Sequence, residues 1–146
     1  MERMAQGHRR NGDDAPPWPV YAWYAAGGPR STARDMLSFG GANLGHKEVN
    51  AKPVSDEVIA AMQLAQKPIY TKPYGIDEQA MTWVNNMGNG NPNLHPVIGT
   101  VGFGTVIVIN PSKDLALFIA VNQAGSNPTG KASRLCGTFR SPKIIS

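Results

Sequence analysis

Two apolar runs lie close together in the second half of the chain, at residues 105–110 and 115–121. Both are rich in Val, Ile and Phe, and the four polar or turn-forming residues 111–114 separate them. Short β-branched and aromatic runs around such a turn favour a β-hairpin over a helix. Because each run is nearly continuously apolar instead of alternating, we expect both faces of the hairpin to be covered. The hairpin is therefore predicted to form the centre of a sheet.

Two helices are predicted before the hairpin. Thr32 and Asp35 have the spacing of a capping box, which predicts a helix from Ala33 to about Leu44 that ends at Gly45. A second helix is predicted to begin at Ser55 and to stop at Lys67-Pro68. Acidic residues follow Ser55 in the first turn, where the helix dipole favours them. The buried stripe expected on this helix consists of Val58, Met62 and Ala65.

The remaining segments are predicted to be short. Tyr74-Gly75-Ile76 and the run from Met81 to Val84 indicate one or two strands, and the Asn- and Gly-rich residues 85–92 indicate a loop. Residues 129–135 have room for a helical turn or two, because Gly137 and Pro142 follow. We expect a single domain over residues 1–146 whose ends, 1–17 and 138–146, are extended or disordered. An aromatic cluster is expected to pack on the first helix: Trp18, Tyr21, Trp23 and Tyr24.

Composition excludes several function classes. The 146 residues are 41% hydrophobic and 16% charged, which is typical of one globular domain. The net charge of +4 is scattered along the chain without a basic helix or zinc-finger spacing, so nucleic-acid binding is not expected. The first twelve residues lack the apolar region of a signal peptide, and no apolar run is long enough to span a membrane.

Metal and cofactor sites are not expected either. The three histidines, His8, His46 and His95, are far apart and form no ligand motif. The single cysteine, Cys136, has no partner for an internal disulfide and is expected to be a small buried apolar residue.

Three glycines, Gly99, Gly102 and Gly104, lead into the first strand of the hairpin. Glycine lets the backbone turn sharply or approach another group closely. These glycines therefore have two interpretations, a tight turn and the edge of a ligand site, and their spacing alone does not separate them.

The segment GTVGFGTVIVINPSKDLALFIAVNQAGSNP, residues 99–128, resembles the closing part of the serine β-lactamases and penicillin-binding-protein-like hydrolases, most of all the class C β-lactamases. In that group a Lys-Thr-Gly triplet leads into Ser-Thr-Gly-Gly-Phe-Gly, a strand, a Pro-containing turn, a second strand and a final Asn-Pro. Here residues 99–104, 110–114 and 127–128 match these parts. Residues 25–28, 31–36 and 63–66 also match, in the right order, so the resemblance covers about residues 18–129.

The resemblance implies an α/β (α+β) fold with an antiparallel sheet and helices packed on its faces. It also implies hydrolysis of a β-lactam amide or a carboxylic ester through an acyl-enzyme, without a cofactor, in a periplasmic or secreted antibiotic-resistance protein. The residues that it assigns to substrate binding are Gly99, Thr100, Gly102 and Asn127. An Asn-Pro turn is the alternative interpretation of Asn127. Relatives end in a long amphipathic helix on the sheet, and the end of this chain is expected to depart from them.

The motifs that carry the family chemistry are missing or altered. None of the serines is followed three residues later by Lys, and none of the tyrosines is followed two residues later by Asn. The Lys-Thr-Gly position falls on Pro96-Val97-Ile98. Esterase-like relatives carry His-x-Gly there, and His95 with Gly99 is a stretched form of that pattern. His95 is therefore the one catalytic candidate, and a solvated loop histidine is its alternative.

These observations leave three hypotheses. The chain is a truncated or divergent C-terminal part of such an enzyme, or a non-catalytic binding or structural module on the same scaffold, or a small hydrolase that uses Ser31 or Ser126 with His95. We expect a small-molecule substrate if the chain is active, no nucleic-acid or membrane partner, and either self-association or a complementing N-terminal half. Without a signal peptide, the chain as written would stay in the cytoplasm.

Overall fold

Two long strands form the centre of the fold, as the apolar runs predict. In the computed structural model, β8 (Phe103–Asn110) pairs antiparallel with β9 (Leu115–Val121) from Gly104↔Val121 to Asn110↔Leu115. The structure describes residues 4–17, 24–71, 77–86, 93–95 and 99–138. The connection is a short 3₁₀ helix, η3 (Pro111–Lys113), and it ends at Asp114 with φ +49°. Asn110 is buried, and its side chain accepts a 3.0 Å hydrogen bond from the Lys113 N–H, which closes this turn.

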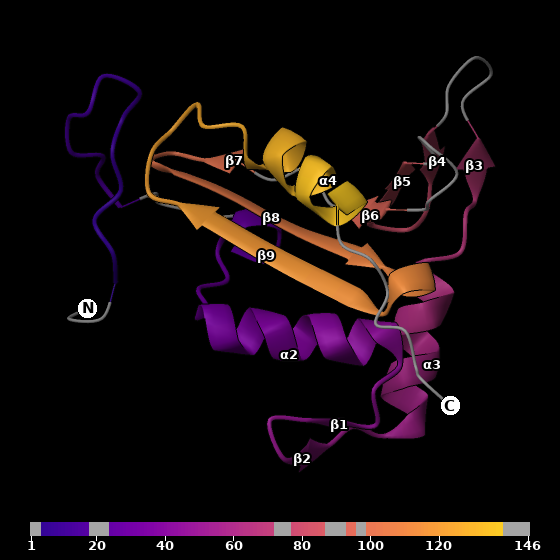
Figure 1. Cartoon of the computed structure of the whole chain (residues 1–146). Helices are drawn as coiled ribbons and strands as arrows, with labels where there is room; N and C mark the ends of the chain where they lie inside the picture. The colour runs from indigo at the N-terminus through magenta and orange to yellow at the C-terminus, as the bar shows by residue number, and fades with distance from the viewer. Residues whose placement is uncertain (1–3, 18–23, 72–76, 87–92, 96–98, 139–146) are drawn as a thin grey trace.

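The hairpin belongs to a seven-stranded antiparallel sheet (Figure 1). The strand order is β3-β4-β5-β6-β8, with β7 also paired to β8, and with β9 on the opposite edge of β8. The five shorter strands are β3 (Tyr70–Thr71), β4 (Asp77–Gln79), β5 (Val84–Asn86), β6 (Asn93–His95) and β7 (Gly99–Thr100).

The pairing of β6 and β7 with β8 has one register. Leu94 of β6 pairs with Ile109, and Gly99 of β7 pairs with Gly104. Leu94 and Gly99 are five residues apart, and so are their partners on β8, Ile109 and Gly104. The two short strands therefore lie one after the other along the same edge of β8. Pro96-Val97-Ile98, between them in the sequence, lies outside the described residues.

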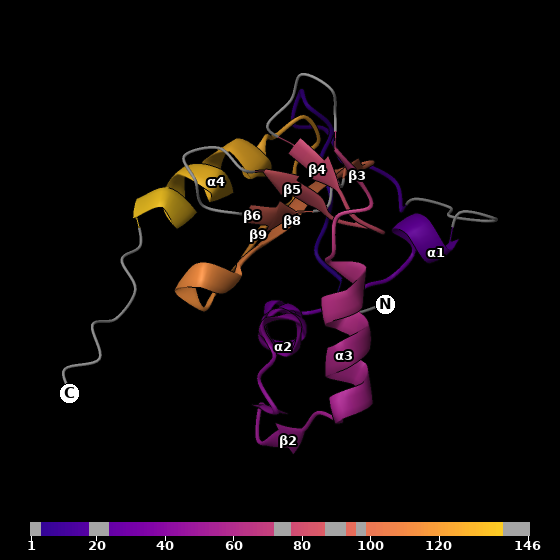
Figure 2. The ribbon, with the colours of Figure 1, turned by 90° about the vertical axis from the view of Figure 1, so that its right-hand side faces the viewer.

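Helices cover the two faces of the hairpin. In Figure 2, which looks along the sheet, α2 (Ala33–Leu44) lies on one side of β8 and β9 and α4 (Pro128–Thr138) lies on the other. Successive side chains of β8 point to opposite faces of the sheet. Ile107 and Ile109 pack on the face that α2 covers, and Val106 and Val108 pack on the face that α4 covers. The predicted antiparallel sheet with helices on its faces is thus confirmed.

The first predicted helix is confirmed with both of its ends. The Thr32 side chain accepts a 3.2 Å hydrogen bond from the Asp35 N–H, and Gly45 ends α2 in the left-handed conformation with φ +94°. α2 comes very close to β9, because a Cβ built on Gly40 would lie 2.6 Å from the Ala116 Cβ. Gly40 therefore sets the distance between this helix and the sheet.

The second predicted helix is confirmed, but its buried stripe was wrong. α3 (Asp56–Ala65) begins after Ser55 and packs beside α2. Its buried residue is Ile59, whereas Val58 is 44% exposed and Met62 and Ala65 are half-buried. α3 packs mainly against α2, and only its last residue reaches the β4–β5 turn, where the Ala65 carbonyl oxygen accepts a hydrogen bond from the Met81 N–H. The buried part of its surface is therefore narrow and rotated by one residue from the predicted stripe.

The strand predicted from Met81 to Val84 begins later than expected. The Ala80 N–H donates to the Trp83 carbonyl oxygen at 2.9 Å, so residues 80–83 form the turn between β4 and β5. β5 continues instead through Asn85 and Asn86, which the composition indicated as loop. The Asn85 side chain donates to Glu78 Oε2 at 3.0 Å, and this contact across the strands holds a loop-favouring residue in the sheet. Tyr74-Gly75-Ile76 lies outside the described residues, as do 87–92.

The C-terminal helix is longer than predicted. The expectation was one or two turns over residues 129–135, but α4 has 11 residues and packs on the sheet. The expected departure from the relatives at this end stays a prediction. Ala132 and Cys136 lie one turn apart on α4 and are buried against Val106 and Val108. This packing outweighs the low helix propensity of the glycines. The burial of Cys136 confirms its predicted role as a small apolar residue.

Two further elements complete the described chain. α1 (Tyr24–Gly27) precedes α2, and a two-stranded hairpin of β1 (Glu48–Val49) and β2 (Lys52–Pro53) connects α2 with α3. The predicted aromatic packing concerns Trp18, Tyr21 and Trp23, which lie outside the described residues.

Candidate functional site

The substrate-binding candidates converge on one end of the central hairpin. β7 and β8 are joined by a tight turn in which Thr100 pairs with Phe103, and Gly102 has φ +85° at the third position of the turn. That conformation is the one that a type II turn requires at this position, and it favours glycine. The turn interpretation of Gly102 is thus supported by its geometry.

The N-terminal loop covers Gly102. A Cβ on Gly102 would lie 2.7 Å from the Ala15 Cβ and 3.1 Å from the Gly7 Cα. The His8 N–H donates to the carbonyl oxygens of Gly102 (3.2 Å) and Asn122 (2.9 Å). The N-terminal loop thus lies between the β7–β8 turn and the residues after β9. Figure 1 shows this loop near the arrowhead of β9. Sequence reasoning treated these residues only as part of an end segment, although Gly7, Ala15 and the Asn11-Gly12 turn were signals of close packing.

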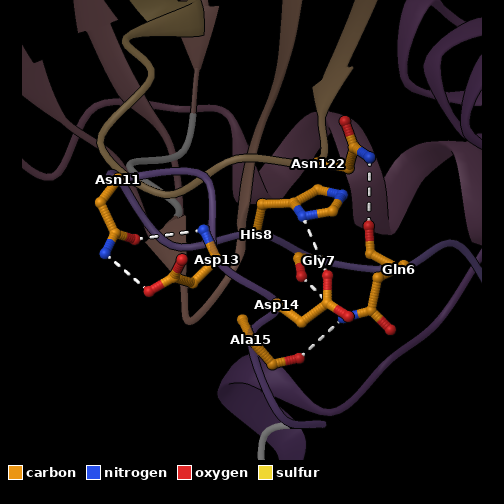
Figure 3. A network of polar contacts seen from close by, with 8 residues as sticks. All are labelled: Gln6, Gly7, His8, Asn11, Asp13, Asp14, Ala15 and Asn122. Carbon is orange, nitrogen blue, oxygen red and sulfur yellow. Dashed lines mark hydrogen bonds and ion pairs between the residues drawn. The ribbon is translucent and has the colours of Figure 1, made fainter.

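A polar network holds this loop in place (Figure 3). The Gln6 side chain donates to the Gly7 and Ala15 carbonyl oxygens, and the Asn122 side chain donates to the Gln6 carbonyl oxygen at 3.1 Å. His8 Nδ1 is buried and lies 3.3 Å from Asp14 Oδ1, within the range of an ion pair but without the alignment of a hydrogen bond. His8 therefore positions the loop against the hairpin.

Gly104 is close to the loop that follows β9. A Cβ on Gly104 would lie 2.5 Å from the Ser126 Oγ, and the Ser126 hydroxyl donates to the Gln123 carbonyl oxygen at 2.8 Å. The next residue, Asn127, precedes α4, and its side-chain oxygen accepts from the Gly130 N–H at 3.2 Å. Asn127 is therefore the N-cap of α4, with Pro128 at the first helical position.

The structure thus brings Gly104 next to Ser126 in the 122–127 loop, covers Gly102 with the N-terminal loop, and places Gly99 and Thr100 on the neighbouring strand β7. Thr100 is half-buried, and Asn127 is exposed. Within the described ranges, β7 pairs on one edge only, that of β8. An unpaired strand edge can hydrogen-bond an amide group, and an exposed amide side chain can donate to a carboxylate.

Arg10 adds a positive charge that sequence reasoning missed. A Cβ on Gly125 would lie 2.5 Å from Arg10 Nε, so the guanidinium packs on the 122–127 loop two residues before Asn127. The Gln123 side chain donates to the Arg10 carbonyl oxygen at 3.3 Å. The sequence offered only a dispersed Arg9-Arg10 pair as a signal.

The backbone positions do not bring Ser126 and His95 together. His95 is in β6, next to Leu94, which pairs with Ile109, whereas Ser126 lies against Gly104, five residues along β8 or roughly 17 Å away. Ser31 is exposed before α2, and its hydroxyl donates to the Thr32 carbonyl oxygen. Among the described side chains, His8 and His46 contact the carboxylates Asp14 and Asp114 and bond no serine hydroxyl.

Cys136 is also unsuited to nucleophilic chemistry. Burial raises the pKa of the Cys136 thiol, and the nearby Lys113 charge lowers it by less. The reactive form of cysteine is the thiolate, so a raised pKa keeps this side chain in its unreactive form near neutral pH. Lys113 Nζ donates to the Cys136 carbonyl oxygen at 2.8 Å, which joins the η3 turn to α4.

The comparison with protein families decides the classification. A family model described as Beta-lactamase matches residues 1–135, which is most of the chain. The chain belongs to the beta-lactamase family. At the level of the family it is a β-lactamase-like serine hydrolase, and its helices and antiparallel sheet fit a partial α/β fold of that type. A search of curated proteins found no sequence that matches the chain.

The described ranges contain neither a metal-ligand cluster nor a membrane-spanning helix. No three His, Cys, Asp or Glu side chains there are arranged to hold a metal ion. The helices of those ranges include none that is both long and apolar enough to cross a bilayer.

Proposed function

We propose that this chain forms one side of the substrate site of a class C-like β-lactamase or a related serine esterase. The substrate is a β-lactam amide or a carboxylic ester, which is hydrolysed through an acyl-enzyme. The Ser-x-x-Lys and Tyr-x-Asn elements needed for that chemistry are absent from these residues. The nucleophile is therefore supplied by residues that are not among these 146.

The observation that carries the proposal is the packing of Gly104, in the first part of β8, against Ser126 in the 122–127 loop. Thr100 belongs to β7, which pairs with this part of β8, and Asn127 follows Ser126 in the sequence, within a chain that matches the beta-lactamase family. These neighbours support the proposal. In this proposal the β7 edge and the Thr100 hydroxyl hydrogen-bond the substrate, and the Asn127 amide donates to its carboxylate. Arg10 attracts that carboxylate electrostatically, because the Lys of the usual triplet is replaced by Pro96-Val97-Ile98. The further candidates of the proposed site are His95, as a catalytic residue, and the backbone at Gly99 and Gly102, for substrate binding.

The chain alone is expected to bind substrate without turning it over. A chromogenic cephalosporin and a short-chain nitrophenyl ester give no burst, and a labelled penicillin does not acylate the protein. In NMR titrations, a penicillin shifts the amide signals of residues 99–104 and 122–127. A burst stoichiometric with protein would reveal a nucleophile within the chain and overturn the proposal.

Complementation tests the missing half. A polypeptide that carries the Ser-x-x-Lys and Tyr-x-Asn elements is expected to restore hydrolysis when it is mixed with or fused to this chain. Thr100→Val should then lower kcat/KM by roughly tenfold, the loss expected for one hydrogen bond to a charged group. Thr71→Val in β3, at the far edge of the sheet, is the matched control and should change nothing.

The alternative is a non-catalytic module on the same scaffold. The close packing of the N-terminal loop on Gly102 favours it, because the chain itself occupies the space over that glycine. Absence of both penicillin binding and complementation would select this alternative. A periplasmic or secreted location and a role in antibiotic resistance are expected only with the hydrolase function.

A further inference from the structure

The N-terminal loop is a small hairpin whose tip is Asn11-Gly12 (Figure 3). Its arms, residues 7–8 and 14–15, are joined by an antiparallel bridge and by a 2.8 Å hydrogen bond from the Ala15 N–H to the Gly7 carbonyl oxygen. Both arms contact the β7–β8 turn, and the first arm also accepts a 2.8 Å hydrogen bond from the Ala124 N–H. The tip connects the two arms, so a change at the tip alters how they lie over the β7–β8 turn.

The Asn11 side chain is held beside the peptide bond that joins Asn11 to Gly12. Its oxygen accepts a 3.2 Å hydrogen bond from the Asp13 N–H, and its nitrogen donates to Asp13 Oδ2 at 2.8 Å. Because both partners belong to the residue two positions further on, the side-chain amide lies along the intervening peptide bond. The Asp13 N–H also draws electron density from the amide carbonyl, which makes the Asn11 Cγ a better target for a nucleophile.

Gly12 supplies the nucleophile, its backbone nitrogen. Gly12 is exposed with φ +96°, and among the described residues no heavy atom lies within 4 Å of the position that a Cβ would take. The nitrogen is therefore shielded neither by a side chain of its own nor by a packed neighbour. Its N–H donates to the Arg9 carbonyl oxygen at 3.0 Å, so this bond must open before the nitrogen reacts. Hydrogen bonds of exposed turns open more readily than those of the core.

We infer that Asn11 is a site of spontaneous deamidation, and that the reaction loosens the N-terminal loop over the β7–β8 turn. The Gly12 nitrogen attacks the Asn11 Cγ and forms a C–N bond. The Cγ–Nδ2 bond breaks, and the amide nitrogen leaves as ammonia with the proton of the Gly12 N–H. Water then opens the cyclic imide at either carbonyl carbon and leaves an aspartate or an isoaspartate. Water is thus the only co-reactant.

The new carboxylate conflicts with its surroundings. The side-chain nitrogen of Asn11, which donates to Asp13 Oδ2, is replaced by an oxygen that can only accept, so two like charges face each other. Asp14, the next residue, adds a third carboxylate to this short turn. Isoaspartate also lengthens the main chain at the tip by one carbon. Either product weakens the closure of the hairpin, and neither consequence depends on the proposed hydrolase function.

Peptide mapping by mass spectrometry tests the reaction in the full chain. During incubation at mildly alkaline pH, the peptide that contains Asn11 should gain the mass of an NH2-to-OH exchange and separate into two forms. Asn11→Gln should stay unchanged, because its imide would need a larger ring. Asn50 is an internal control, since it is also an exposed turn residue but is followed by Ala51, whose side chain shields the nitrogen. It should react much more slowly than Asn11.

Hydrogen exchange tests the effect on the loop. Asn11→Asp should raise the exchange rates of the Ala15 and Ala124 amides roughly tenfold, the effect of losing one hydrogen bond to a charged group. The amides of β8 should be unchanged, which shows that the fold is intact. Asn11→Ala removes the donor without adding a charge and should have a smaller effect. High salt should reduce the difference between these two variants, because it screens the repulsion.

The matched control is Asn50→Asp, which adds the same charge in the turn between β1 and β2 and should leave the Ala15 and Ala124 amides unaffected. Three results would overturn the inference. One is an Asn11 that stays intact in the folded chain while the urea-unfolded chain deamidates there. Another is an Asn11→Asp variant whose Ala15 and Ala124 amides exchange as in the wild type. The last is equally faster exchange in Asn50→Asp, since the effect would then not arise at the tip.

Discussion

Strands β8 and β9 have similar sequences and different surroundings. They pair residue by residue, both are apolar, and the same two helices pack on their faces. Nevertheless Val106, Val108 and Ile109 have no exposed surface, whereas the β9 side chains remain partly exposed. The difference arises because β8 has neighbours on both edges and β9 has a described neighbour on one. Burial of a strand thus depends on its position in the sheet as much as on its hydropathy.

The largest expected effect comes from shortening a side chain in each strand. Ile109→Ala should lower the free energy of unfolding by roughly 3–4 kcal/mol, because it leaves a cavity that the surroundings fill poorly. Ile119→Ala should cost about half as much, since Ile119 is only half-buried. Urea unfolding followed by circular dichroism measures both. Equal losses would show that β9 is packed no less tightly than β8.

The next effect concerns the packing of α2 on β9, which is tested at Gly40. Gly40→Ala should destabilise the protein by about 1–2 kcal/mol, because the new methyl group overlaps Ala116, although alanine favours the helix by about 1 kcal/mol. Thermal unfolding gives the change. The double variant with Ala116→Gly removes the overlap and should recover most of the loss. A stabilised Gly40→Ala would mean that α2 lies further from β9 than the structure places it.

The packing of α4 on β8 is tested at Asn127, the residue that caps this helix. Asn127→Ala should cost about 1 kcal/mol because the N-cap of α4 is lost, and Asn127→Ser should cost only a few tenths because serine also caps. Urea midpoints of the two variants give the comparison. The serine variant also separates structure from binding, since it keeps the cap and loses the amide. If both variants unfold alike, the cap contributes little to the packing of α4.

The smallest effect concerns Cys136, which reports on α4 without perturbing it. The folded protein binds the thiol proton more tightly than the unfolded chain, because burial raises the thiol pKa. This contribution to stability is therefore complete below the ordinary thiol pKa and is lost as the pH rises through the raised value. Stability curves between pH 7 and 10 should fall more for the wild type than for Cys136→Ala. Rapid thiol labelling of the folded protein would contradict the burial.

The central hairpin and α2, the helix on one of its faces, could be predicted from sequence, because their signals are local. Continuous apolar runs, the Thr32 cap and the Gly45 stop each depend on neighbouring residues, and all were confirmed. The stripe on α3 and the length of α4 could not be predicted, since both depend on contacts with distant segments. Asn85 shows the same limit, because its partner Glu78 is on another strand.

The candidate site was predicted only in part. The Gly99–Gly104 turn and Asn127 were found because their motifs are contiguous, and the structure places both at one end of the hairpin. The docked loop from Gly7 to Ala15 was not anticipated. Its contacts with Gly102 join segments that are far apart in the sequence, and no short-range pattern marks them. The roles of Thr100 and Asn127 in binding stay predictions.

The alternation along β8 divides the interior into two compartments. Odd-numbered residues of this strand serve the compartment under α2, and even-numbered residues serve the one under α4. The strand backbone is the wall between them, so a change of volume in one compartment is screened from the other. Substitutions beneath α4, the helix that Asn127 caps, can therefore accumulate while the packing around Trp83 and Ile107 stays as it is. The residues around Asn127 can thus diverge in sequence without loss of the fold.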